Sequence, residues 1–179
     1  MRQHKKVRIF HLMIALTLMV SFFILPAAAD DEERLPLRIT EVMAANKHTL
    51  KDSFGQSPDW IEIFNTSDEP VSLEGYALTD KKSKPDKFVF PADAVIGPGG
   101  FLIVFASGLA RGFDDEYHAP FKLSKSGESV YLFYRGKVAD SVFFGPQLTD
   151  VSLALDEEGI FRQTLMPTPG AVNIIVPVD

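Results

Sequence analysis

The sequence of 179 residues contains no cysteine. That absence excludes disulfide bonds, thiolate metal sites and cysteine nucleophiles. Small exported domains often need disulfides because their cores are too small, but about 150 residues can bury roughly 70% of the unfolded surface without them. We therefore expect a fold that is stabilised by packing alone, with neither a disulfide nor a structural metal.

Histidine is scarce as well, and only His48 and His118 lie beyond the first 30 residues. They do not form a metal-binding pair at helical spacing, and no serine lies in a GxSxG or SxxK context. The sequence therefore predicts no enzyme activity and no cofactor. A triad assembled from distant residues stays open as an alternative.

The first 30 residues differ in character from the rest of the chain. Residues 1–8 carry four basic residues and no acid, residues 9–25 are almost entirely apolar, and the sequence PAAAD follows. This order is typical of a signal peptide over residues 1–29, cleaved between Ala29 and Asp30. The alternative is an uncleaved anchor, although the apolar run is shorter than the roughly 20 residues of a spanning helix.

Both readings place the remaining chain outside the cytoplasm, secreted or in the cell envelope. Contact with a membrane is expected only if the leader is retained. Four of the 18 basic residues belong to the leader, so the mature chain has 14 against 24 acidic residues, a net charge of −10. Duplex nucleic acid is thus an unsuitable partner, because phosphate binding normally needs a basic face.

Helical periodicity is also missing from the mature chain. Short apolar runs recur between turn residues instead, which is typical of an all-β sandwich or barrel. We expect a charged, frayed lead-in over 30–36, one domain over 37–175 with eight or nine strands in two antiparallel sheets, and a tail over 176–179. The segments RGK and DEEG are predicted as hairpin turns, and GPGG as a tight turn rather than a phosphate loop.

The stretch SPDWIEIFNTSDEPVSLEGYALTD, residues 57–80, illustrates the expected strand pattern. Ile61 and Ile63 alternate with Trp60 and Glu62, so one face of the first strand should enter the core while the other is mixed. A polar break and a second strand follow. Gly75 interrupts that second strand, which indicates a bulge or a close backbone approach.

Seven motifs occur in a fixed order along residues 39–173: ITEVMAAN, DWIEIFNTSDEPVSLEGYALTD, FVFP, IGPGGFLIVFAS, FKLSKSGESVYLF, VADSVFFGPQLTDVSLAL and PTPGAVN. Together they resemble the bacterial lamin-tail domain family, whose fold is an immunoglobulin-like antiparallel β-sandwich. The residues at family-motif positions are Asp59, Trp60, Glu62, Asn65, Gly75, Asp80, Gly127, Asp140, Gly145, Asp150, Pro169, Gly170 and Asn173.

The resemblance also implies a kind of function. Bacterial versions resemble accessory modules of exported proteins, often beside hydrolase domains, and are thought to bind or tether rather than catalyse. We therefore expect a non-catalytic, exported binding or surface-interaction module. Its expected partner is an extracytoplasmic protein or a cell-envelope polymer, which the sequence does not identify.

Two loops carry alternative hypotheses. Lys81, Lys82, Lys84 and Lys87 could bind a polyanion, although a run of charges is more often a solvated loop. Asp114, Asp115, Glu116 and His118 could hold a hard cation through oxygen ligands and serve a metal-assisted hydrolase. Their spacing is not that of a regular calcium loop, so no metal is the preferred interpretation.

Overall fold

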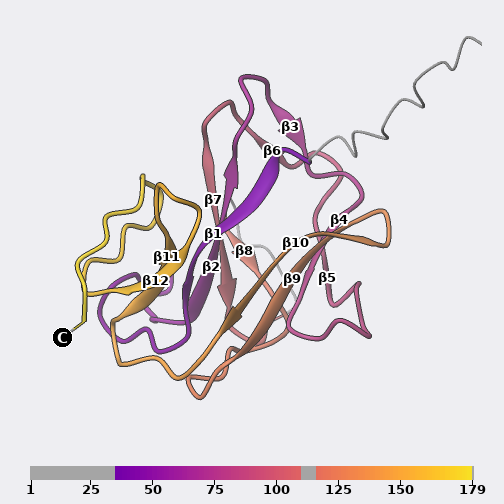
Figure 1. The fold of residues 1–179 in the computed structure, drawn as a ribbon. Helices are drawn as coiled ribbons and strands as arrows, with labels where there is room; N and C mark the ends of the chain where they lie inside the picture. The colour runs from indigo at the N-terminus through magenta and orange to yellow at the C-terminus, as the bar shows by residue number, and fades with distance from the viewer. Residues whose placement is uncertain (1–34, 110–115, 179) are drawn as a thin grey trace, which may run out of the picture. The chain divides into compact units, whose positions relative to one another are not determined.

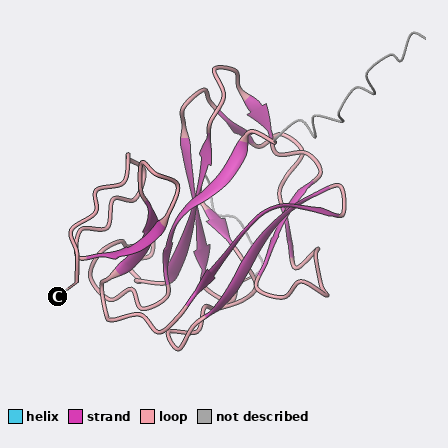
Figure 2. Cartoon of the chain, in the orientation of Figure 1, coloured by secondary structure: helices cyan, strands magenta, loops and turns pink. Residues whose placement is uncertain are grey.

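The computed structural model describes residues 35–109 and 116–178, and residues 34–179 form one compact unit. The predicted leader, the Ala29–Asp30 cleavage site and most of the lead-in lie outside the described residues. Within the described ranges, no helix has the length and apolar character needed to cross a membrane. Every regular element there is a β-strand (Figure 2).

The larger sheet has six strands in the order β12-β11-β1-β2-β7-β8 (Figure 1). Its strands are β1 (Leu37–Met43), β2 (Asp59–Asn65), β7 (Phe101–Ala106), β8 (Tyr117–His118), β11 (Ser152–Leu155) and β12 (Phe161–Thr164). All neighbours are antiparallel except β7 and β8, which run parallel.

The second sheet has four antiparallel strands in the order β10-β9-β4-β5. They are β4 (Tyr76–Thr79), β5 (Phe88–Val89), β9 (Glu128–Tyr134) and β10 (Lys137–Phe144). A separate pair joins β3 (Val71–Ser72) to β6 (Val95–Ile96). The turn Arg135-Gly136 reverses the chain between β9 and β10, with φ of 48° and 78°, as the RGK segment predicts.

The main core lies between these two sheets. Ile61, Ile63 and Val104 enter it from the six-stranded sheet, and Leu132 and Val142 enter it from the four-stranded sheet. All five side chains are buried. The protein is therefore an immunoglobulin-like antiparallel β-sandwich, as the sequence predicts.

The expected strand count needs correction. The described residues form twelve strands rather than eight or nine, and the difference lies in four two-residue strands, β3, β5, β6 and β8.

The chain at Gly75 forms a turn and not the expected bulge. In this turn Tyr76 N–H donates to the Leu73 carbonyl at 2.9 Å, and Gly75 has φ 83°. A close approach exists too, because a Cβ at Gly75 would lie 3.3 Å from Cγ of Arg135.

A β-bulge at Thr40 changes which residues of β1 face the core. The register passes from Ile39 opposite Ile63 to Glu41 opposite Glu62, so one residue is inserted. After the bulge Val42 faces the main core, and Glu41 and Met43 face the opposite side. Without the inserted residue Glu41 would share the core face of Ile39. A second bulge lies at Ala139 in β10.

The opposite face of the six-stranded sheet is buried as well. Met43, Trp60 and Phe105 form a second apolar cluster, against which Leu50 and Ile103 pack. Strand β2 is therefore buried on both faces, whereas the sequence predicts one core face and one mixed face.

The C-terminal segment continues along β12. Leu165 N–H donates to the Val176 carbonyl, and Val176 N–H donates to the Thr164 hydroxyl, both at 2.9 Å. Hydrogen bonding with the domain thus reaches into the predicted 176–179 tail.

Candidate functional site

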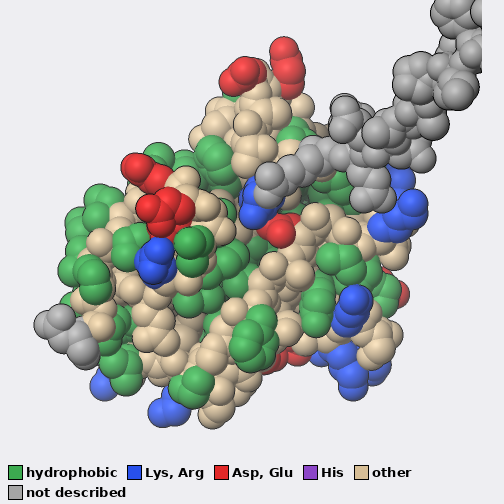
Figure 3. All heavy atoms as spheres, viewed as in Figure 1, with side chains coloured by type: hydrophobic (Ala, Val, Ile, Leu, Met, Phe, Trp, Pro, Cys, Tyr) green, Lys and Arg blue, Asp and Glu red, His purple; other side chains and the backbone are tan. Residues whose placement is uncertain are grey.

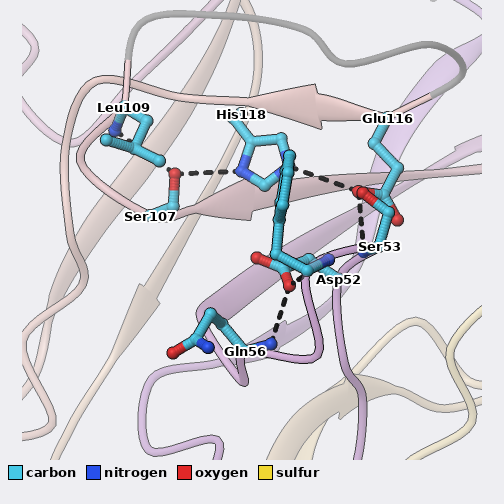
Figure 4. A network of polar contacts seen from close by, with 8 residues as sticks. Asp52, Ser53, Gln56, Ser107, Leu109, Glu116 and His118 are labelled. Carbon is cyan, nitrogen blue, oxygen red and sulfur yellow. Dashed lines mark hydrogen bonds and ion pairs between the residues drawn. The ribbon is translucent and has the colours of Figure 1, made fainter.

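A buried histidine connects two polar side chains at one end of the six-stranded sheet (Figure 4). The Nδ1 atom of His118 lies 3.0 Å from the Ser107 hydroxyl, and its Nε2 atom lies 3.4 Å from Oε2 of Glu116. The parallel pairing of β7 with β8 brings these residues together, because Phe105 is the register partner of His118. The two rings stack with centroids 5.2 Å apart.

The contacts of His118 define the proton positions of the network. A carboxylate only accepts hydrogen bonds, so in the neutral ring Nε2 carries the proton and Nδ1 accepts from the Ser107 hydroxyl. The Ser107 oxygen also accepts from Leu109 N–H at 3.2 Å. This arrangement fixes the serine hydroxyl in one orientation and leaves its remaining lone pair available.

The order Ser–His–Glu is that of a hydrolytic triad, but the surroundings differ from one. His118 is fully buried, whereas a general base must reach the substrate's leaving group. An oxyanion hole needs unoccupied donors beside the nucleophile. Gly108 N–H, which follows Ser107, already donates to the carbonyls of Ala119 and Phe121. The network thus orients a hydroxyl instead of activating it.

Glu116 is tied to the loop that follows β1. Its Oε2 atom accepts from Ser53 N–H at 3.1 Å as well as from the histidine. Partial burial raises the pKa of this carboxyl, but the bonds from Ser53 and His118 outweigh burial and lower the pKa below its ordinary value. Asp52 shapes the same loop by accepting the N–H groups of Phe54 and Gln56.

An open pocket of about 370 Å³ lies beside this network. Its lining residues are Asp52, Gln56, Ser57, Pro58, Asp59, Ala106, Ser107, Leu109 and Lys122. Burial raises the pKa of Asp59, while Asn46 N–H and the charge of Lys122 act against that rise. The pocket therefore offers carboxylate acceptors, an ammonium donor, hydroxyls and an amide around small apolar surfaces.

The acidic-loop hypothesis is tested only in part. Asp114 and Asp115 lie outside the described residues, and the structure places Glu116 next to His118. Within the described ranges no group of three or more His, Asp or Glu is arranged to hold a metal ion. Among the described residues, the two nitrogens of His118 contact the Ser107 hydroxyl and the Glu116 carboxylate.

The lysine loop, residues 81–87, connects β4 to β5. An ion pair of 2.5 Å between Asp80 and Lys87 closes its base, and the Lys87 ammonium lies 5.8 Å from the Phe121 ring centroid. Lys81, Lys82 and Lys84 are exposed. Three of the four predicted binding lysines thus face solvent, and the fourth stabilises the loop.

Two buried carboxyls, that of the family-motif residue Glu62 and that of Glu41, lie where the sequence predicts no special chemistry. Glu62 accepts from the Thr40 hydroxyl at 2.7 Å and from Gly170 N–H at 2.7 Å. Its register partner Glu41 accepts from the Ser152 hydroxyl and from Thr168 N–H. Both are fully buried; burial raises the pKa of Glu41, and burial together with the neighbouring Glu41 charge raises the pKa of Glu62 to about 7.

The remaining motif residues organise loops and turns. Asn65 donates to the carbonyls of Glu69, Ile96 and Gly97, and Asn173 donates to those of Thr40 and Leu155. A Cβ at Gly127 would lie 2.6 Å from the Phe144 carbonyl oxygen, so only glycine fits there.

Two motif aspartates bind backbone N–H groups, Asp140 that of Ile39 and Asp150 those of Lys47 and His48. Gly145 has open space around it, and Pro169 precedes Gly170 in the loop over Glu62.

The fold and these motif contacts define an immunoglobulin-like β-sandwich domain. A family model described as Lamin Tail Domain matches residues 32–146, and the chain belongs to that family. The family is one of non-enzymatic β-sandwich domains that act as interaction modules. Strands β11 and β12 and the C-terminal segment follow the matched range. No curated protein matches the chain.

The sequence named Glu116 and His118 only as candidate metal ligands, and it gave no role to Ser107, Asp52 and Lys122. Ser107 lies 11 residues before His118, and only the parallel strand pairing makes them neighbours. The sequence signal that could have pointed to Ser107 is its position directly after a strand, where side chains reach the edge of a sandwich.

Proposed function

We propose that the protein is an exported, non-catalytic binding module of the lamin-tail type, and that the pocket beside Ser107 holds part of its partner. The observation that carries this proposal is the fixed hydroxyl: Ser107 lines the pocket while buried His118 determines its orientation. A wall with fixed hydrogen-bonding groups lowers the entropy cost of binding, which suits recognition.

The pocket chemistry favours a polar partner with alternating donors and acceptors. Asp52 and Asp59 accept, Lys122 donates, and Gln56 and Ser57 do both. Sugar hydroxyls and peptide amides have this character, and both occur in envelope polymers and extracytoplasmic proteins. The export itself rests on the leader over residues 1–29, which the sequence alone supports.

The test measures co-sedimentation of the chain starting at Asp30 with an insoluble polymer of glycan strands and peptides from cell envelopes. The variants are Ser57→Tyr, which fills the pocket opening, and Lys122→Ala, which removes its ammonium. Lys47→Ala, an exposed lysine away from the lining, is the matched control. We expect binding that both pocket variants weaken and the control retains. Equal binding by all four proteins would contradict the pocket assignment.

Catalysis needs a separate assay with esters, phosphodiesters, peptides and glycans in the presence of divalent metals. We expect no turnover. Turnover that survives repurification and disappears in His118→Ala would contradict the proposal of a non-catalytic binding module and show that the protein is an enzyme.

A further inference from the structure

The outward face of the four-stranded sheet carries an apolar row that crosses all four strands. Val89, Ala77, Phe133 and Val138 are successive register partners across β5, β4, β9 and β10. Phe133 and Ala77 are nearly buried and form the floor of the row. Val89 and Val138, at its two ends, are 59% and 41% exposed.

Phe143 extends this apolar surface along β10. It lies opposite Ser129, on the same face of the sheet as Tyr131 and Phe133, and it is 76% exposed. That is the largest exposed fraction among the exposed large hydrophobic side chains of the described residues. Exposed apolar side chains that share one face of a sheet mark an interaction surface more often than a single exposed side chain does.

The lysine loop lies at the same end of the sheet as Phe143. Thr79 at the end of β4 is the register partner of Tyr131, and the loop begins beyond it, next to Ser129. The Asp80–Lys87 pair closes the base of the loop, and the exposed Lys81, Lys82 and Lys84 lie at this end of the four-stranded sheet. Figure 3 shows hydrophobic and Lys or Arg side chains side by side over this part of the molecule.

A second apolar surface serves as a comparison, because its charge is opposite. Ile160, Val172, Ile174 and Val176 are exposed near the β11–β12 hairpin. Asp156, Glu157 and Glu158 surround that region, with Arg162 paired to two of the acids. In Figure 3 acidic side chains gather at the turn of this hairpin. Of these two surfaces, the one on the four-stranded sheet combines exposed apolar groups with exposed lysines, and the one at the β11–β12 hairpin combines them with acids.

We propose that the outward face of the four-stranded sheet binds the surface of a bilayer that contains anionic phospholipid. Phe143, Val89 and Val138 enter the interface between headgroups and acyl chains, and Lys81, Lys82 and Lys84 contact the phosphates. A soluble polyanion would use the lysines but give no reason for the exposed aromatic ring. The lipid surface accounts for both features, and it is independent of what the pocket holds.

The experiment uses the chain from Asp30, because the leader would itself bind lipid. This chain contains all strands and core residues of the compact unit, which begins at residue 34. Co-sedimentation is measured with vesicles of phosphatidylcholine alone and with vesicles that also contain phosphatidylglycerol. We expect binding to the anionic vesicles only, with an affinity that falls as salt is added.

Two variants separate the contributions. Charge reversal of Lys81, Lys82 and Lys84 to Glu should weaken binding by about a hundredfold, and Phe143→Ser by about tenfold. The controls are Lys47→Glu with Lys51→Glu, and Val172→Ser, which alter an exposed lysine pair and an exposed apolar residue elsewhere. Both controls should bind as the parent does, and circular dichroism should be unchanged in all.

Three outcomes would overturn the proposal: no binding to anionic vesicles, equal binding to neutral vesicles, or the same loss in the controls. A Phe143→Ser variant that binds normally, together with competition by a soluble polyanion, would assign the lysines to a polymer instead. Loss of polymer binding at the pocket would leave the vesicle result unaffected, so the two proposals fail separately.

Discussion

The two sheets of the sandwich differ in how many of their faces are covered. The central strands of the six-stranded sheet are buried on both sides, by the main core on one face and, on the other, by Leu50 against Trp60 and by the loop over Glu62. The four-stranded sheet is buried on one side and keeps exposed apolar residues on the other. The first sheet therefore supports the fold, and the second has surface left for an external partner.

The largest expected effect comes from a charge inside the doubly covered sheet. Ile61→Asp should destabilise the domain by about 4 kcal/mol or more, since an unpaired buried charge has no compensating partner. Lys82→Asp should stay within about 0.5 kcal/mol because the residue is solvated. Urea unfolding measures the free energy of unfolding of both variants. Similar values for the two variants would contradict the assignment of Ile61 to the core.

The buried carboxyls of the six-stranded sheet predict that the free energy of unfolding depends on pH. The pKa of Glu62 is raised to about 7 in the folded protein, so the folded state binds a proton that the unfolded state has already released. The contribution of Glu62 to the free energy of unfolding is then fully present below about pH 4.5, and it decreases by on the order of 3 kcal/mol as the pH rises to about 7. Unfolding measured at a series of pH values checks this.

Glu62→Gln is the control for that prediction. The amide keeps the shape but cannot ionise, so the decrease between pH 5 and pH 8 should become much smaller. An unchanged profile in this variant would assign the pH dependence to other groups, of which Glu41 is the nearest.

A smaller effect is expected at the C-terminal cover. Asn173→Ala removes three side-chain hydrogen bonds, the two donated to the carbonyls of Thr40 and Leu155 and the one accepted from the Thr168 hydroxyl, and should cost about 1–2 kcal/mol. Hydrogen exchange should speed up over residues 165–176 before it does in β2. Uniform acceleration over both regions would mean that the cover and the sheet open together.

The smallest effect is expected on the open face. Phe143→Ser should change the free energy of unfolding by less than about 0.5 kcal/mol, because the ring has little contact to lose. Chemical unfolding of the soluble domain provides the measurement. A loss of 2 kcal/mol or more would show that the ring packs within the domain, and the contrast between the sheets would disappear.

Sequence patterns predicted the parts of the fold that depend on alternation and turn chemistry. Ile61 and Ile63 lie in the core as expected, and the RGK, DEEG and GPGG segments form the predicted reversals. The lamin-tail motifs indicated the family. These features depend on residues close together in the chain, so the sequence pattern predicts them.

Other features depend on contacts between distant segments. The bulge at Thr40 reverses the alternation of β1, so no periodicity places Glu41 beside Glu62. The two residues of β8 form a strand only because β7 lies beside them. The pairing of Ser107 with His118 follows from that contact, and the candidate pocket could not be read from either residue alone.

The bulge at Ala139 has a further consequence for how the protein behaves at high concentration. Strand β10 is the outer strand of the four-stranded sheet, and an exposed strand edge can pair with another copy and start aggregation. The bulge interrupts the regular row of backbone donors and acceptors, and the exposed Lys137 adds a charge at the start of the strand. The bulge and this charge thus protect an edge strand that lies beside exposed apolar residues against fibril growth.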